Sequence, residues 1–81
     1  MENDAEKKVD QTVDACGLKC PMPILRAKKV LATMESGQLL KVLATDPAAA
    51  SDFHFFGRQT GNEVVGESEE KGVFSIIVKR K

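Results

Sequence analysis

Residues 14–23, Asp-Ala-Cys-Gly-Leu-Lys-Cys-Pro-Met-Pro, contain the clearest signal for the start of a helix in this chain. Its two prolines exclude a helix interior unless a helix is only starting there, because proline lacks a backbone N–H and fits the first turn. From Ile24 onward the apolar residues recur at helical spacing, at 24, 27, 30, 31 and 34. We therefore predict that Cys20 lies at or just before the start of a helix. Ser36-Gly37 ends it, since glycine suits the position after a helix.

Sequence signals on both sides of this stretch predict the remaining helix and the strands. Asp46-Pro47 is typical of a helix start, and Gly61-Asn62 of a helix end. Residues 69–72 predict a hairpin turn. The remaining elements are strands over 9–15, 39–45, 63–68 and 73–79 and a helix over 47–60. The order β-α-β-α-β-β predicts an α/β fold, a two-layer α+β sandwich with two helices on one face of a four-stranded sheet.

Length and composition limit the kind of protein. A chain of 81 residues makes one domain. We place that domain at residues 9–81 and expect residues 1–8 to form a flexible N-terminus. The core is small, so a deep pocket for a large cofactor is not expected, and we predict no cofactor. Residues 1–8 are polar and acidic, and no apolar run approaches a membrane span. We therefore expect a cytoplasmic protein that does not contact membranes directly.

The charges balance overall but not along the chain. The 12 basic and 12 acidic residues give a formal net charge of zero, which argues against direct nucleic-acid binding. Residues 19–41 are nevertheless cationic. This segment is either a solvated face or a basic docking surface for a protein partner beside a thiol. Its candidate partner-binding residues are Lys19, Arg26, Lys28 and Lys29.

Cys20 is the candidate nucleophile. A thiolate is the reactive form, and a helix N-terminus or nearby cations lower a cysteine pKa from about 8.5. Both influences are predicted at Cys20, and the flanking prolines stiffen the turn. The alternative is a buried, inert cysteine, which is a common core residue.

Other candidates are weaker. Cys16 precedes Cys20 by four residues, so a disulfide, a resolving role or a plain loop position are all open. Two cysteines and one distant histidine offer too few ligands for zinc, and we predict no metal site. His54 is the candidate general base of a Cys–His arrangement, but a structural or surface role is the alternative. The phenylalanines around it are interpreted as core residues. Asp14 can hold the loop by local hydrogen bonds.

Several motifs of the sequence resemble those of a known protein family. Asp14-x-x-Gly17-Leu18-x-Cys20-Pro21-x-Pro23, the basic helix and Thr45-Asp46-Pro47-Ala48 are similar to the TusA/SirA family of small sulfur-carrier proteins. The resemblance covers about residues 9–80. It implies a mixed sheet in the order 1-2-4-3, with Cys20 accepting sulfane sulfur as a persulfide and relaying it to a partner protein. The motif residues that would shape the site are Asp14, Gly17, Leu18, Pro21 and Pro23.

The resemblance also implies the partners. The sulfur donor would be a cysteine desulfurase or a rhodanese-like protein. The acceptor would serve tRNA thiolation, molybdenum-cofactor synthesis or sulfur oxidation. The family does not require a cysteine at position 16, so no role carries over to Cys16. Two alternatives stay open: a thiol redox or regulatory module that uses Cys16 and Cys20, and a small RNA-binding module.

Overall fold

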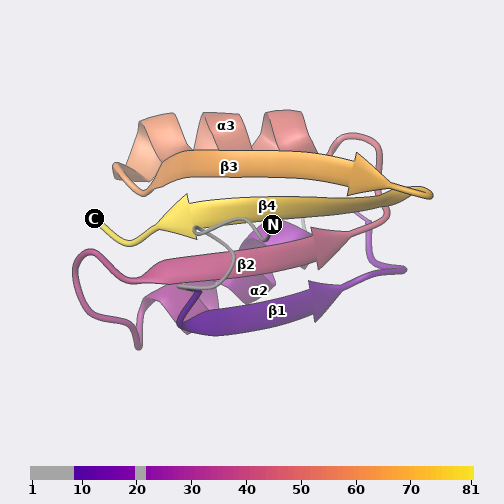
Figure 1. Ribbon diagram of the computed structural model, residues 1–81. Helices are drawn as coiled ribbons and strands as arrows, with labels where there is room; N and C mark the ends of the chain where they lie inside the picture. Colours follow the sequence, from indigo (N-terminus) through magenta and orange to yellow (C-terminus); the bar gives the residue numbers. More distant parts are fainter. Residues whose placement is uncertain (1–8, 20–21) are drawn as a thin grey trace.

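A computed structural model describes residues 9–19 and 22–81. These residues form one four-stranded sheet in the order β1-β2-β4-β3, and both helices pack on the same face of it (Figure 1). The predicted element order, the mixed sheet and the strand order are confirmed. The elements are β1 (Gln11–Ala15), α2 (Met22–Leu31), β2 (Leu39–Ala44), α3 (Ala49–Thr60), β3 (Glu63–Glu70) and β4 (Val73–Lys79).

The strand pairing brings two connections together. β1 runs parallel to β2, with Ala15 opposite Ala44 at their carboxyl ends. β4 is antiparallel to both β2 and β3. Because β1 and β2 end at the same edge of the sheet, the connections that follow them, residues 16–19 and 45–48, emerge side by side. The carboxyl ends of parallel strands are where open α/β sheets place their ligand sites.

The core lies between the sheet and the helices. Leu40, Val42 and Phe53 are fully buried there, and Phe53 packs edge-on against Phe56, with ring centroids 6.0 Å apart. β2 alternates between buried and half-buried residues because its neighbours β1 and β4 cover its edges while the helices cover one face. Phe55 departs from the predicted core role, since 58% of its surface is exposed on the outer side of α3.

Both helices are shorter than predicted. α2 ends at Leu31 instead of Ser36, because the next turn tightens: Thr33 and Met34 donate their N–H groups to carbonyls three residues back. Met34 remains buried, which explains the continued apolar spacing. α3 begins at Ala49, two residues after Pro47. Asp46 caps the preceding turn instead, where its Oδ1 accepts the Ala48 N–H at 3.1 Å.

The C-terminal residues are tied into the fold. Asn62 is almost fully buried, and its Oδ1 accepts the Lys81 N–H at 2.8 Å. The Arg80 guanidinium donates from Nε to the Leu31 carbonyl at 2.9 Å, next to the end of α2. These bonds hold the chain end at the edge of the sheet opposite to residues 16–19.

Two further sequence predictions concern the N-terminal residues and contact with membranes. The expected flexible N-terminus, residues 1–8, lies outside the described residues. Within the described part of the chain, no helix is long and apolar enough to cross a membrane.

Candidate functional site

The connection after β1 is held by hydrogen bonds from both sides. The Cys16 N–H donates to Asp14 Oδ1 at 3.1 Å, and the Gly17 N–H donates to Thr45 Oγ1 at 2.8 Å. Gly17 has a φ of +83°, a conformation that favours glycine because it lacks Cβ. Leu18 donates its N–H back to the Ala15 carbonyl at 3.2 Å and packs its side chain against the core. Of the predicted site-shaping residues, Gly17 and Leu18 lie in this loop, and Asp14, near the end of β1, accepts a hydrogen bond from it.

The start of α2 follows directly. The Met22 N–H, at the first residue of α2, donates to the Lys19 carbonyl at 2.8 Å. Pro23 is buried in the first turn of the helix, as its sequence position predicts. That turn contains no acidic residue of its own that would offset the positive end of the helix dipole. Cys20 and Pro21 themselves lie outside the described residues.

Cys16 occupies a distinct electrostatic environment. Its side chain is exposed and unbridged. Desolvation, followed by the hydrogen bond to Asp14 and the negative charge of that carboxylate, raises the pKa of the Cys16 thiol. Conversely, hydrogen bonds from Cys16 and the more distant Arg26 charge lower the pKa of Asp14. The raised pKa lowers the fraction of Cys16 that is thiolate, the form that a nucleophilic or redox role requires.

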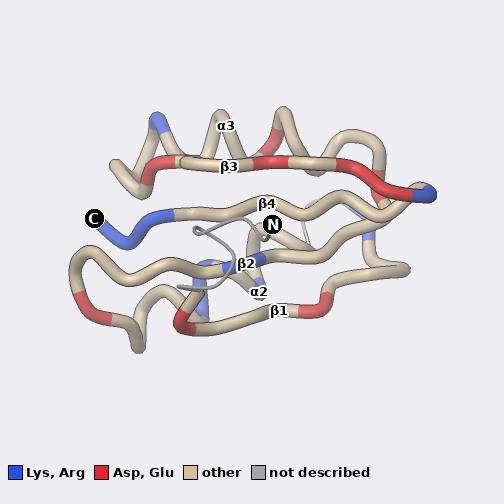
Figure 2. The backbone as a smooth tube through the Cα atoms, viewed as in Figure 1, with Lys and Arg blue, Asp and Glu red and all other residues tan. Residues whose placement is uncertain are grey.

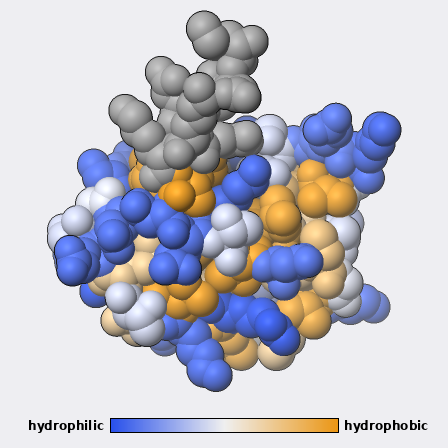
Figure 3. Space-filling model, turned by 60° about the horizontal axis from the view of Figure 1, so that its bottom comes forward, coloured by the Kyte–Doolittle hydropathy of each residue, from blue (hydrophilic) through white to orange (hydrophobic). Residues whose placement is uncertain are grey.

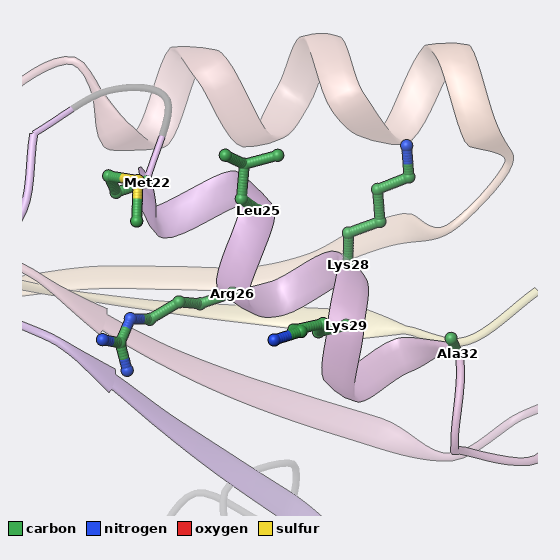
Figure 4. A pocket seen from close by; sticks show the side chains of 6 residues that line it. All are labelled: Met22, Leu25, Arg26, Lys28, Lys29 and Ala32. Carbon is green, nitrogen blue, oxygen red and sulfur yellow. The ribbon is translucent and has the colours of Figure 1, made fainter.

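The predicted partner-binding cations all lie on the surface. Lys19, Arg26, Lys28 and Lys29 are exposed, and the last three belong to α2, which carries blue, basic positions behind the sheet in Figure 2. Leu25 and Lys28 point from α2 toward α3, whereas Arg26 and Lys29 extend away from α3 (Figure 4). The acidic residues of the chain gather elsewhere, notably along β3.

Apolar side chains are exposed between these cations. Met22 is 42% exposed and Leu25 48%, and Phe55 lies on the neighbouring helix. Hydrophobic surface therefore alternates with hydrophilic surface on the outside of the molecule (Figure 3). Two open hollows lie beside these side chains. One, of about 750 Å³, runs along α2 from Met22 to Ala32, and the other, of about 340 Å³, is lined by residues of both α2 and α3. We call Met22, Leu25, Lys28 and Phe55, with Arg26 and Lys29, the helix-face patch.

Two residues have surroundings that the sequence does not predict. The sequence assigns Thr45 no role of its own, although its position after the strand parallel to β1 places it beside the Cys16–Lys19 loop. Phe55 was assigned to the core, yet its place one residue before the buried Phe56 puts it on another face of α3.

His54 does not join this loop. It lies on the side of α3 that faces β3, where its Nε2 contacts Glu67 Oε1. It lines a hollow with Arg58 and Val64, while the loop lines a different hollow with Thr45 and Pro47. Across residues 9–19 and 22–81, no group of three or more His, Cys, Asp or Glu side chains is arranged to hold a metal ion.

Comparison with known proteins agrees with this architecture. The family model described as sulfurtransferase TusA matches residues 11–80. The sulfur carrier protein TusA of Allochromatium vinosum is 55% identical over 71 residues, which are 88% of this chain and 93% of that protein. The protein of the same name from Pseudomonas entomophila is 38% identical over 72 residues, 89% of this chain and 90% of its own length.

A solved structure shares the fold. The SirA-like protein of Desulfitobacterium hafniense superposes with a TM-score of 0.76 at 28% identity, covering 85% of this chain and 95% of that one. The family model spans nearly every described residue, from β1 to the end of β4. The chain therefore belongs to the TusA/SirA family.

Proposed function

We propose that this protein is a sulfur carrier that accepts sulfane sulfur on Cys20 as a persulfide and passes it to a partner protein. The observation that carries the proposal is the start of α2 at Met22, two positions after Cys20, with no acidic residue in its first turn. A thiol next to a helix start is stabilised as the thiolate by the positive end of the helix dipole. Family membership supports the same role.

Sulfur transfer needs only a nucleophilic sulfur that a partner protein can reach. The Cys20 thiolate attacks the outer sulfur of a persulfide on the donor. The S–S bond of the donor breaks, the donor cysteine leaves as a thiolate, and Cys20 now carries the extra sulfur. In the second transfer a thiolate of the acceptor attacks that outer sulfur, and Cys20 leaves as a thiolate. No external oxidant or reductant is consumed, and a low thiol pKa favours Cys20 as a leaving group.

The donor is a cysteine desulfurase or a rhodanese-like enzyme, and the acceptor serves tRNA thiolation, molybdenum-cofactor synthesis or sulfur oxidation. Both partners have to bring a sulfur atom to Cys20, so both meet the surface around it. The helix-face patch begins at Met22 and combines exposed apolar side chains with three cations. It fits a partner surface that offers an apolar projection inside an acidic rim.

Intact mass spectrometry tests the transfer. The protein is incubated with polysulfide, or with a cysteine desulfurase and cysteine, and is weighed without reductant. We expect the natural chain and the matched control Cys16→Ser to gain the mass of one or more sulfur atoms, which dithiothreitol removes. Cys20→Ser should gain none. Equal sulfur addition to Cys20→Ser, or none to the natural chain, would overturn the proposal.

A further inference from the structure

The loop that leads to Cys20 is attached to a neighbouring connection by Thr45. The Gly17 N–H donates to Thr45 Oγ1 at 2.8 Å, across 28 positions of the chain. The bonds from Cys16 to Asp14 and from Leu18 to Ala15 are local by comparison. Thr45 directly follows the last residue of β2, which is paired with β1 and β4. Thr45 is therefore attached to a strand that is paired on both sides.

The hydrogen bond between Gly17 and Thr45 is well suited to fix the position of the loop. A β-branched side chain such as threonine has few χ1 rotamers, so the direction of Oγ1 is restricted. On the loop side, Gly17 is held at a φ of +83°, and half-buried Leu18 packs against the core. The Lys19 carbonyl then accepts the Met22 N–H at 2.8 Å. Hydrogen bonds and packing contacts thus run from Thr45 through residues 17–19 to Met22, the first residue of α2.

We propose that Thr45 is a positioning residue for the nucleophile: its hydroxyl holds the Gly17 amide and so fixes residues 17–19, the backbone that leads into Cys20. This inference rests on the proposed function of Cys20 as the sulfur-accepting nucleophile. Thr45 acts through the backbone of residues 17–19 and does not contact the transferred sulfur.

The test compares four substitutions in the Cys16→Ser chain, in which Cys20 is the sole thiol. Thr45→Val removes the acceptor and preserves the branched shape, while Thr45→Ser retains the hydroxyl. Thr33→Val is the matched control, because Thr33 is also exposed and donates from Oγ1 to the Val30 carbonyl at 2.7 Å, at the far end of α2. Thr45→Ala provides a second removal of the hydroxyl. Each chain is followed by the pH profile of iodoacetamide alkylation, by sulfur uptake from polysulfide and by Tm.

We expect Thr45→Val and Thr45→Ala to move the alkylation profile to higher pH and to slow alkylation near neutral pH about three- to tenfold, because the thiolate fraction falls. Sulfur uptake should slow in parallel. Thr45→Ser should restore the profile. Thr33→Val should leave it unmoved even where its Tm falls as much as that of Thr45→Val, which separates positioning from general stability.

Two results would overturn the inference. One is an unmoved alkylation profile and normal sulfur uptake in both Thr45→Val and Thr45→Ala. The other is the same shift in Thr33→Val. Failure of the proposed function looks different: the parent Cys16→Ser chain takes up no sulfur from polysulfide, whatever the substitutions at Thr45 do to alkylation.

Discussion

The Asp14 carboxylate accepts the Cys16 backbone N–H at 3.1 Å, and its charge contributes to raising the pKa of the thiol on that same residue. Asp14 therefore fixes the start of the loop, and its hydrogen bond and charge add to desolvation, the largest cause, in raising the pKa of the Cys16 thiol. Cys20 follows four positions later in the sequence, before a helix whose first turn has no acidic residue.

Removing the Asp14 charge should activate Cys16. In a Cys20→Ser chain, Asp14→Asn eliminates the negative charge that disfavours the thiolate, so we expect alkylation of Cys16 near pH 8 to quicken about two- to fivefold. Liquid chromatography with mass detection measures the rate. Asp10→Asn is the control, because Asp10 is an exposed carboxylate at the other end of β1. Equal rates in Asp14→Asn and its parent would contradict the assignment.

Stability at low pH should depend on Asp14 with a defined sign. Its pKa is lowered in the folded protein, chiefly by the hydrogen bond from the Cys16 backbone. A carboxyl group with a depressed folded pKa stabilises the fold above its unfolded pKa of about 3.9, and this contribution is lost as the pH falls through the folded value. We expect the Tm difference between the natural chain and Asp14→Asn to be present at neutral pH and to close in acid. A Tm difference that grows as the pH falls would contradict the lowered pKa of Asp14.

Charge reversal on α2 should affect partner association more than the thiol. We expect Lys28→Glu with Lys29→Glu to slow sulfur transfer from a protein donor about tenfold or more at low salt, because steering by complementary charge is lost. Transfer from polysulfide should change little. The control is Arg58→Glu with Lys79→Glu, which changes the net charge equally at exposed cations outside the helix-face patch. Equal slowing in both pairs would show that net charge, not this patch, matters.

Two phenylalanines on one helix should behave oppositely. Phe55 is 58% exposed and Phe53 is fully buried. We expect Phe55→Ala to leave the free energy of unfolding nearly unchanged and to weaken transfer with a protein donor. Phe53→Ala should lower that free energy by about 3–5 kcal/mol, because a large core side chain leaves a cavity. Urea unfolding and donor-dependent transfer rates give the two readouts. A strongly destabilised Phe55→Ala chain would refute the docking role.

Gly57 is required by packing within α3. A Cβ at this position would lie 2.8 Å from the Asn62 carbonyl oxygen, which belongs to the backbone. Replacing glycine by alanine inside a helix usually adds about 1 kcal/mol of stability. Here we expect Gly57→Ala to destabilise by about 1–3 kcal/mol, since the backbone has to shift. Gly66→Ala is the control, because its Cβ would meet Ile77 only at ordinary contact distance, 3.7 Å. Chemical denaturation measures both.

Much of the fold follows from the sequence because local signals agree with the topology. The prolines after Cys20, the apolar spacing from Ile24 and the Gly61 stop each specify a helix end independently of tertiary contacts. Helix lengths were harder to predict. Met34 continues the apolar period and is buried, but it belongs to a tighter turn in which side-chain spacing does not reveal the backbone pattern.

The candidate site is predictable only in part for the same reason. Cys20 is singled out by its neighbours in the chain, and the cations of α2 by their spacing. Thr45 lies far from the loop in sequence, and its role depends on the parallel register that sets Ala15 opposite Ala44. Phe55 illustrates the other difficulty. Three phenylalanines within four positions cannot all face one side of a helix, but only the packing of Phe53 and Phe56 shows which one is left outside.

The anchoring of Lys81 to Asn62 has a practical consequence. The C-terminus is fixed at the end of the sheet where Lys79 pairs with Leu39, whereas the Cys16–Lys19 loop leaves the end where Ala15 meets Ala44. A fluorophore, tether or fusion partner joined after Lys81 would project away from the reactive loop. Immobilising the protein through that point would present the loop and the start of α2 to solution, where donors and acceptors can be captured in turn on the same oriented molecules.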